Sequence, residues 1–317
     1  MRQVANCMSG YKYLFGPVPS RRLGASLGVS PIPERTCNYS CVYCQLGRTL
    51  RMTNTRQEFF PLEEILAEFR EYLRGSIPFD VVTVVGEGEP TLYSRLGELI
   101  AGLKKETDKP VAVITNGALL YDAEMRRELM EADIVLPSLD AVTEEQYRKI
   151  DRPMGSIGFA EMAEGLRQFA REYQGQLWIE IMLVDGMNDS PEDIAAFKEF
   201  LGTIDYDRVY LNTPVRPPAE GFVHTSAPER IDLAARELGG ISIDQLTSGS
   251  FFSEVEDPYE AILSIARRHP MNQFEVESFL EAREIPADQR QALMERLGQD
   301  PGITVVPYKG IITYRVN

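Results

Sequence analysis

Residues 37–44 read CNYSCVYC and hold three of the four cysteines in the chain of 317 residues. The spacing C-x3-C-x2-C does not allow the three thiols to form a complete set of disulfides, but it suits a shared metal or iron–sulfur cluster. A helix with small buried cysteines on one face is an alternative, because offsets of four and seven are helical. Pro31 and Pro33 upstream, and the turn-prone Asn38 and Ser40 between the thiols, disfavour that helix.

A structural zinc site is a second alternative for these thiols. Such a site normally takes four protein ligands. The two histidines, His224 and His269, and the fourth cysteine, Cys7, all lie far from the segment in the sequence. A [4Fe–4S] cluster on three thiolates fits the ligand count better and leaves one iron open for a further ligand.

The charge of the chain is uneven. With 33 basic and 48 acidic side chains the net charge is -15, which argues against a protein that coats nucleic acid nonspecifically. Residues 1–57, which include the three cysteines, nevertheless carry eight basic side chains and one acidic side chain. The charge therefore leaves recognition of a single anionic molecule open.

The composition also indicates the cellular compartment in which the protein is found. No run approaches the roughly 18 apolar residues that span a bilayer, and residues 1–10 lack the apolar stretch of a signal peptide. Four cysteines are too few for a secreted scaffold held by disulfides. We therefore expect a cytoplasmic protein that does not contact a membrane.

Outward from the cysteines, short β-branched runs alternate with segments of helical period, as in βα units around a parallel sheet. The predicted strands are residues 25–31, 80–85, 111–115, 133–137, 177–184 and 208–212. The predicted helices are residues 62–74, 95–105, 122–131, 159–173 and 191–201. This repeat is too short for a closed eight-unit barrel, so we predict an α/β fold with a partial, open (β/α)6 barrel that binds ligands at the carboxyl ends of its strands.

The last part of the chain has a different pattern. Residues 257–269, 273–282 and 287–298 predict three short helices, and residues 303–306 and 311–316 predict a hairpin. Three helices followed by a hairpin are typical of a winged helix. We therefore predict a barrel domain over residues 1–240, a linker over 241–256 and a winged-helix-like domain over 257–317.

The predicted recognition helix of this last domain is not strongly basic. Arg290 and Arg296 are balanced there by Asp288 and Glu295. Such a face is poorly suited to phosphate, so docking of a partner protein is favoured over binding of nucleic acid.

With Tyr43 as the aromatic residue before the last cysteine, the motif resembles the CxxxCxΦC signature of the radical S-adenosylmethionine (SAM) superfamily. The resemblance implies a [4Fe–4S] cluster on Cys37, Cys41 and Cys44 whose open iron binds SAM. It also implies reductive cleavage of SAM to methionine and a 5'-deoxyadenosyl radical. The cofactor supplies this radical, and the protein supplies placement and exclusion of water.

Two loops that follow predicted strands resemble further motifs of the superfamily. Gly86-Glu87-Gly88-Glu89-Pro90 resembles the GGE-type motif that binds the methionine amine, and its glycines and carboxylates suit that contact. Thr115-Asn116-Gly117 resembles the TNG segment that lies beside the cofactor. Either loop, taken alone, could be a plain turn.

Two later segments extend the resemblance. Ser138 and Asp140 correspond to the SLD segment that contacts the SAM ribose; their alternative role is to cap a helix that begins near Thr143. Leu183, in the run EIMLVDGMN at residues 180–188, falls where members of the superfamily pack apolar residues on adenine. The alternative is that this run belongs to the core.

Residues 12–240, including GEGEPTL at 86–92 and TPVRPP at 213–218, resemble the branch that contains the wyosine-synthesising tRNA enzymes. Those enzymes hold a second cluster on additional amino-terminal cysteines, whereas this chain offers only Cys7. The resemblance therefore does not imply pyruvate-dependent wyosine chemistry for this chain. Arg216 is a candidate catalytic residue that binds an anionic substrate; the alternative is a solvated loop arginine.

The sequence thus predicts a radical SAM enzyme that abstracts hydrogen from an unidentified anionic or RNA-derived substrate. A flavodoxin or ferredoxin-type protein is the expected electron donor. One alternative is an activating enzyme that makes a radical on a partner protein docked on the winged helix. Another is a noncatalytic iron–sulfur regulator that senses redox state and binds DNA.

Overall fold

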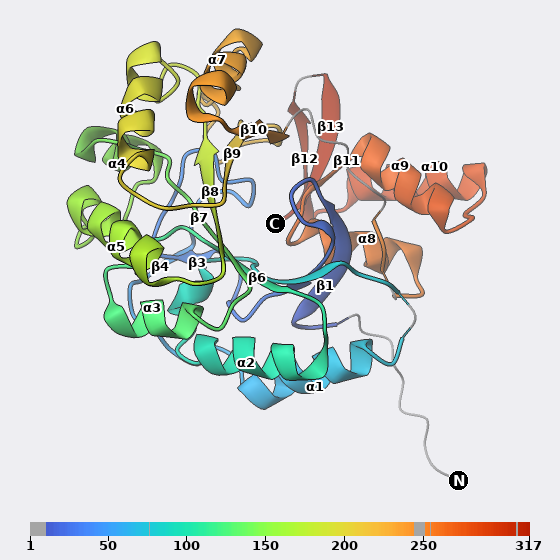
Figure 1. The fold of residues 1–317 in the computed structure, drawn as a ribbon. Helices are drawn as coiled ribbons and strands as arrows, with labels where there is room; N and C mark the ends of the chain where they lie inside the picture. Colours follow the sequence, from blue (N-terminus) through green and yellow to red (C-terminus); the bar gives the residue numbers. More distant parts are fainter. Residues whose placement is uncertain (1–10, 76, 244–250, 254, 309) are drawn as a thin grey trace.

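The computed structural model describes residues 11–75, 77–243, 251–253, 255–308 and 310–317. Its main feature is one curled sheet of eight strands in the order β1-β2-β5-β6-β7-β8-β9-β10 (Figure 1). These strands are β1 (Leu14–Ser20), β2 (Gly24–Val29), β5 (Val81–Val84), β6 (Val111–Thr115), β7 (Ile134–Pro137), β8 (Gln176–Met182), β9 (Arg208–Asn212) and β10 (Ile241–Ser242). β1 pairs antiparallel with β2, and all later neighbours are parallel. The predicted partial barrel is confirmed.

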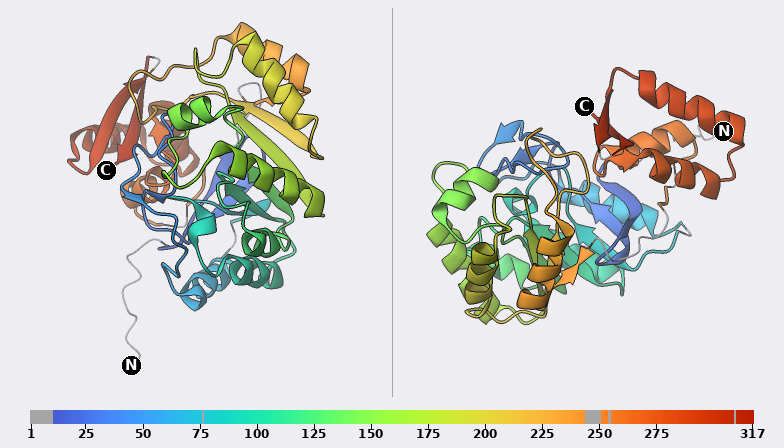
Figure 2. Two further views of the ribbon diagram at one scale, coloured as in Figure 1. Left: turned by 90° about the vertical axis from the view of Figure 1, so that its left-hand side faces the viewer. Right: turned by 90° about the horizontal axis from the view of Figure 1, so that it is seen from above.

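Helices cover the outside of this sheet, as Figures 1 and 2 show. They are α1 (Leu62–Tyr72), α2 (Leu96–Glu106), α3 (Ala123–Leu129), α4 (Glu144–Ile150), α5 (Phe159–Glu172), α6 (Pro191–Leu201) and α7 (Pro228–Leu238). The largest core lies between the helices and the outward side chains of the strands, such as Val82 and Val84 of β5. Side chains alternate along a strand, so Val81 and Trp178 belong to a smaller cluster on the other face, inside the barrel.

The predicted helices and strands are confirmed to within a few residues at each end. Ser190 caps α6 in a reciprocal capping box with Asp193. Several elements were not predicted, and α7 and β1 are the longest of them. α7 carries an ordinary signal, with Pro228 in its first turn and Gly239 in the left-handed conformation (φ 62°) after its end. β1 contains Pro17 and Pro19, which argue against a central strand but are tolerated at the edge of a sheet.

Residues 257–317, called here the C-terminal module, form the second part of the fold. The module contains α8 (Pro258–Ala266), α9 (Gln273–Ala282) and α10 (Ala287–Gln299), with a sheet in the order β11-β13-β12. Its strands are β11 (Met271–Asn272), β12 (Ile303–Tyr308) and β13 (Ile311–Val316). The predicted three helices and hairpin are present, and β11 adds a short third strand. A role as a winged helix stays a prediction.

The C-terminal module packs against the open side of the barrel, beside β1 (Figure 2). Phe15 and Val18 of β1 belong to the same buried cluster as Tyr259, Ile262 and Phe279 of the module. Through this shared core, β1 belongs to the barrel sheet and also packs against the C-terminal module. β10 pairs with β9, so the sheet continues two residues into the segment predicted as a linker. Residues 244–250 and 254 of that segment lie outside the described residues.

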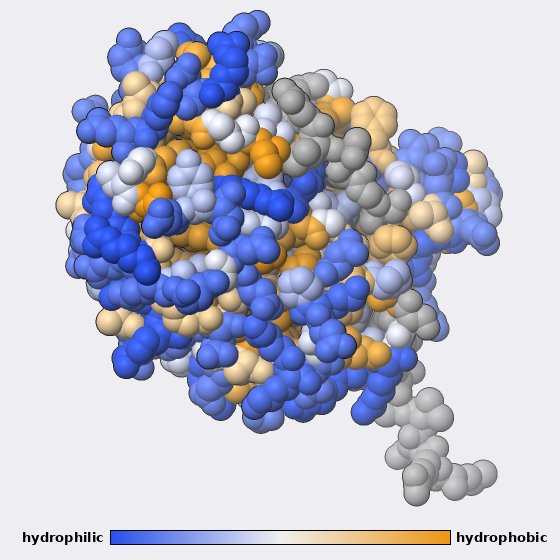
Figure 3. Space-filling view, viewed as in Figure 1, coloured by the Kyte–Doolittle hydropathy of each residue, from blue (hydrophilic) through white to orange (hydrophobic). Residues whose placement is uncertain are grey.

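Within the described residues, no helix is long and apolar enough to cross a membrane. Seen from the side of Figure 1, hydrophilic residues cover the outer helices, while apolar residues show in the middle of the barrel (Figure 3).

Candidate active site

The three cysteines lie in an irregular loop. Cys37 ends the short strand β3 (Thr36–Cys37), which pairs with β4 (Arg51–Met52), and the chain then forms turns through Cys41 and Cys44. The helical alternative is therefore wrong. All three thiols are free and half-buried.

Residues at the end of α4 hold this loop in place. The amides of Ser40 and Val42 donate to the carbonyl oxygens of Asp151 and Ile150, at 3.1 and 2.9 Å. The thiol of Cys41 lies 3.8 Å from a carboxylate oxygen of Asp151. Burial and the neighbouring Asp140 raise the pKa of Asp151 well above its usual range. No sequence signal pointed to Asp151, because its proximity to Cys41 arises only from the fold.

One cavity of about 410 Å³ is lined by all three cysteines. Its walls include Thr83 and Val85 at β5, Ile114 on β6, and the following inward or strand-end residues of β8 and β9: Glu180, Met182, Asn212 and Thr213. The cavity thus lies at the carboxyl ends of the parallel strands, where such folds bind ligands. A larger cavity of about 960 Å³, between residues 217–232 and β12, has no cysteine in its lining.

The glycines of the GEGEP loop are required by close packing of the chain on itself. A Cβ atom on Gly88 would lie 1.9 Å from the carbonyl oxygen of Thr36, and one on Gly86 would lie 2.1 Å from the Ser30 hydroxyl. These residues therefore bring the end of β5 against the strand that carries Cys37. Both glycines also line the cavity.

Glu89 is buried and connects the GEGEP loop to the TNG segment. Its Oε1 accepts hydrogen bonds from the Thr91 amide (3.0 Å) and from the hydroxyls of Thr91 and Thr115 (both 2.6 Å). Among the described residues, only the Asn116 amide donates to its Oε2, at 2.8 Å. Burial raises the pKa of Glu89 above its ordinary value, although these donors oppose the shift. Pro90 begins a short 3-10 helix, Pro90–Leu92.

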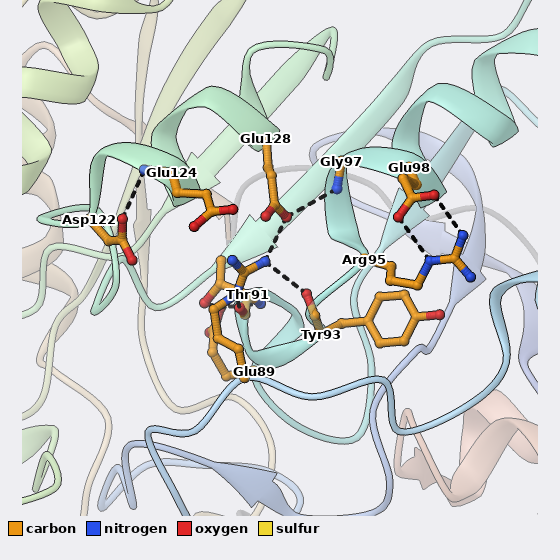
Figure 4. A network of polar contacts seen from close by, with 10 residues as sticks. Glu89, Thr91, Tyr93, Arg95, Gly97, Glu98, Asp122, Glu124 and Glu128 are labelled. Atoms are coloured by element: carbon orange, nitrogen blue, oxygen red, sulfur yellow. Dashed lines mark hydrogen bonds and ion pairs between the residues drawn. The ribbon is translucent and has the colours of Figure 1, made fainter.

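Contacts that reach α3 and α2 on the outside of the sheet hold this loop in place. Arg56 donates to the carbonyl oxygens of Thr91 and Tyr93 and forms an ion pair with Glu128. Figure 4 shows Glu128 also accepting the Gly97 amide at the start of α2. The position of Glu89 is therefore fixed by the TNG segment, which donates to its carboxylate, and by Arg56, which bonds to the residues that follow it.

The second carboxylate of the loop, Glu87, points to the C-terminal module. It forms an ion pair with Arg268 at 3.3 Å, and the two side chains are 12% and 8% exposed. The two glutamates of the predicted SAM motif thus have different partners: Glu89 bonds within the barrel, and Glu87 bonds to the module.

Asn116 connects the TNG segment to the cysteine loop. Its side-chain amide donates to Asn38 Oδ1 at 2.7 Å and to the sulfur of Cys37 at 3.6 Å. Thr115 is buried beside Glu89, as described above. The structure thus brings these two predicted residues to the cysteines.

Asp140 and Tyr43, both predicted cofactor-binding residues, contact each other. The Tyr43 hydroxyl donates to Asp140 Oδ2, while Asp140 Oδ1 accepts the Met182 amide at 2.7 Å. Burial raises the pKa of Asp140 above its usual range. α4 is capped by Thr143, so the capping role considered for Ser138 and Asp140 is wrong. Ser138 follows β7 and forms an isolated bridge to Glu180.

Leu183 does not face the cavity. It is fully buried in the large core between sheet and helices, as its alternative interpretation expected. Met182, one residue earlier, lines the cavity. Neighbours on a strand point to opposite faces, and the register of β8 places Glu180 and Met182 inside. The polar Glu180, two positions before Met182 and therefore on the same face of β8, was the signal that could have identified Met182.

Arg216 lines the cavity but is fully engaged by the C-terminal module. It pairs with Glu275 at 3.0 Å, donates to the Pro270 carbonyl at 2.9 Å and lies 2.5 Å from His269 Nε2. It is therefore no solvated loop arginine. Since a guanidinium can only donate, Nε2 of His269 accepts and the ring proton is on Nδ1. Burial and nearby arginines hold the pKa of His269 well below its ordinary value.

Three residues of the module line the same cavity as the cysteines: Arg268, His269 and Glu275. Sequence reasoning missed all three, because nothing in the local pattern of the module indicates which face meets the barrel. The site is thus built from both parts of the chain.

The thiols fit an iron–sulfur cluster better than a single metal ion. Among the residues that the structure describes, no three His, Cys, Asp or Glu side chains converge on one metal position, which argues against the zinc alternative. Cluster thiolates bind different irons and need only line one cavity, as these do. Burial raises the pKa of Cys37, Cys41 and Cys44, so the thiols are protonated until a metal displaces the protons.

Comparisons with known proteins agree with this chemistry. Residues 32–198 match the sequence model of the radical SAM superfamily. A UPF0026 protein of Methanocaldococcus jannaschii is 32% identical over 314 residues, which cover 96% of this chain and 95% of that protein. A Brachyspira hyodysenteriae protein named GTPase Obg is 43% identical over 205 residues. That match covers 65% of this chain but 30% of the relative, so the chain spans less than a third of its length.

Among solved structures, a radical SAM methyltransferase from Sphaerobacter thermophilus has a TM-score of 0.51 and 18% identity. The match covers 69% of this chain and 67% of the methyltransferase. At that identity the likeness supports the partial-barrel fold alone. Because the family match spans more than half of the chain, and a full-length relative exceeds 30% identity, the protein belongs to the radical SAM superfamily.

Proposed function

We propose that the protein is a radical SAM enzyme that holds a [4Fe–4S] cluster on Cys37, Cys41 and Cys44 and binds SAM in the adjoining cavity. When bound, the cluster supplies the electron that cleaves SAM to methionine and a 5'-deoxyadenosyl radical, which abstracts hydrogen from the substrate. The observation that carries the proposal is that three thiols and the ends of successive parallel strands line one cavity of about 410 Å³.

Glu89 follows the cavity-lining Gly88 and does not line the cavity itself; we propose that its carboxylate receives the amino group of SAM. An ionised carboxylate oxygen has about two acceptor positions. Oε1 already takes three donors, whereas Oε2 takes only the Asn116 amide. Oε2 therefore retains the capacity to accept a charge-assisted hydrogen bond from an ammonium group.

The contacts between loops support a preorganised site. Asn116 bonds to the segment of Cys37, and Asp140 bonds to Tyr43, so two of the predicted SAM segments are tied to the cysteine loop. Residues held in this way keep reacting groups in place without further ordering at the moment of reaction. We propose that these contacts orient SAM and that the C-terminal module limits access of water.

The charge of the cavity supports an anionic substrate. Its lining contains five arginines, Arg21, Arg22, Arg35, Arg216 and Arg268, and two glutamates, Glu180 and Glu275. His269 is neutral, and four of these arginines pair with carboxylates: Arg22 with Glu180, Arg35 with Glu34, Arg216 with Glu275 and Arg268 with Glu87. An anionic or RNA-derived ligand would bind by replacing one of these carboxylates at its guanidinium. A substrate anion that reached Arg216 would compete with Glu275 for the guanidinium.

The proposed electron donor is an acidic flavodoxin or ferredoxin-type protein, which the basic amino-terminal region would attract. The likeness to the wyosine branch contributes only the scaffold and radical initiation to this proposal. Cys7, the only additional cysteine, lies outside the described residues, and one thiol cannot hold a second cluster.

Anaerobic reconstitution tests the proposal. With iron and sulfide, the wild-type chain should bind about four irons, as one cluster requires. After reduction in the presence of SAM it should release 5'-deoxyadenosine. Cys41→Ala should lose both properties, whereas the control Cys7→Ala should keep them. Release of 5'-deoxyadenosine by Cys41→Ala at the wild-type rate would overturn the proposal.

A further inference from the structure

Two arginines from distant parts of the chain face the turn that follows Cys44. A Cβ atom on Gly47 would lie 3.6 Å from Nη1 of Arg315 and 3.7 Å from Nη1 of Arg35. The Gly47 amide donates to the Cys44 carbonyl at 3.1 Å, so this turn is part of the cysteine loop. Arg35 precedes the cysteines, and Arg315 lies on β13, the last strand of the C-terminal module.

The charge of Arg315 is not compensated within the part of the chain that the structure describes. Arg315 donates through Nη2 to the Pro217 carbonyl at 2.5 Å and forms no ion pair with a described residue. Its Nε is buried and has no hydrogen-bond partner among the residues described. A partly buried cation with an unpaired donor is costly, which indicates that an anionic partner completes this position.

Among the described residues, the only acidic group that pairs with either arginine is Glu34. Its Oε1 lies 3.1 Å from Nε of Arg35. The group of this turn that becomes negative when it binds a cluster is therefore the sulfur of Cys44, whose backbone carbonyl accepts the Gly47 amide at 3.1 Å.

We propose that Arg315, together with Arg35, is a positioning residue for electron transfer that stabilises the negative charge gained when the cluster held at Cys44 is reduced. This inference rests on the cluster of the proposed function. It goes beyond that function because it assigns the electrostatic control of the cluster to the C-terminal module. Arg315 lies outside the stretch 32–198 that matches the superfamily.

The electron balance gives the sign of the effect. One electron passes from a low-potential donor, such as titanium(III) citrate, to the cluster, so the donor is oxidised and the cluster is reduced by one unit of charge. Three thiolates already make the site anionic, and a nearby fixed cation stabilises the reduced form more than the oxidised form. Arg315 and Arg35 therefore raise the reduction potential.

The test is a redox titration of the reconstituted full chain, followed by electron paramagnetic resonance without SAM. At a fixed solution potential, Arg315→Gln should lower the ratio of reduced to oxidised cluster about tenfold, equivalent to about 59 mV for one electron. Arg315→Lys keeps the charge and should remain within about twofold of the wild type. Arg290→Gln, on α10 and paired with Glu281, should leave the potential unchanged.

A second variant covers the case in which Arg315→Gln fails to fold or to bind iron. Arg35→Gln removes the other guanidinium from the same turn and should shift the ratio in the same direction. If both glutamine variants bind iron fully and titrate like the wild type, the inference is overturned. An equal shift in Arg315→Lys and Arg315→Gln would also overturn it, because packing rather than charge would then be responsible.

The outcome is separable from that of the proposed function. A wild-type chain that binds the cluster but never cleaves SAM contradicts the proposed function, while the titration still decides the role of Arg315. A wild-type chain that binds no cluster contradicts both.

Discussion

The barrel side and the module side of the cavity are held by different kinds of contact. On the barrel side, Glu89 and Asp140 accept hydrogen bonds from neighbouring loops of the same domain. On the module side, the main contacts are ion pairs between the two parts of the chain, Arg268 with Glu87 and Arg216 with Glu275. The barrel side is therefore an internally bonded frame, and the module side is an interface whose strength depends on charge.

The largest expected effect comes from breaking the buried pair at that interface. Arg268→Gln leaves Glu87 buried without its cation and should lower the free energy of unfolding by about 3 kcal/mol. The double variant with Glu87→Gln should recover part of this loss, since no unpaired charge remains. Chemical denaturation of the wild type, both single variants and the double variant measures the coupling.

The exposed pair Arg70–Glu106 is the matched control for this cycle, with side chains that are 43% and 29% exposed. Arg70→Gln should lower the free energy of unfolding far less than Arg268→Gln does, because solvent screens an exposed pair. Strictly additive effects of Arg268→Gln and Glu87→Gln would show that the two side chains do not interact, and the description of the interface would fail.

On the barrel side, Met182, the last residue of β8, and Leu183, which follows it, should respond differently to substitution by alanine. Leu183→Ala removes a fully buried core side chain and should cost about 3 kcal/mol of stability, with unchanged SAM affinity. Met182→Ala should cost less stability but weaken SAM binding about tenfold, because Met182 lines the cavity. Equilibrium binding of SAM to the reconstituted variants measures the difference. A loss of SAM affinity in Leu183→Ala, with none in Met182→Ala, would reverse the assignment.

A smaller effect concerns pH at the module side. The pKa of His269 in the folded protein lies well below 6.5, so the unfolded chain takes up the proton first. The contribution of neutral His269 to stability is complete above about pH 6.5 and is lost as the pH falls from there toward the folded pKa, at up to about 1.4 kcal/mol per pH unit. His269→Gln should reduce this pH dependence.

Unfolding curves measured between about pH 7.5 and 5 provide the comparison. The same substitution at the exposed His224, His224→Gln, is the matched control for the loss of a histidine. A His269→Gln protein with the same slope as the wild type would assign the pH dependence to other groups.

The barrel side could be predicted from the sequence because its signals are local. The spacing of Cys37, Cys41 and Cys44 is contained in eight residues, and each predicted SAM loop directly follows a recognisable strand. The parallel sheet then brings the strand ends together. Leu183 was misplaced by one position because the apolar run at 180–188 obscures which residues face inward.

The module side could not be predicted in this way. Arg216 meets Glu275, and Glu87 meets Arg268, across long stretches of chain, and each of these residues alone is an ordinary surface charge in the sequence. Their pairing depends on how the module packs against β1, which a shared apolar core determines. Likewise, the glycines of the GEGEP loop suggested contact with a ligand, whereas the structure explains them by close approach to Thr36 and Ser30.

The central claim is that the cavity lined by the three cysteines places SAM against a three-thiolate cluster. Electron paramagnetic resonance of the reduced, reconstituted chain tests it most directly. The spectrum should change when SAM is added, because SAM becomes a ligand of the open iron, and the change should be weaker in Met182→Ala. A spectrum that is identical with and without saturating SAM would contradict the claim.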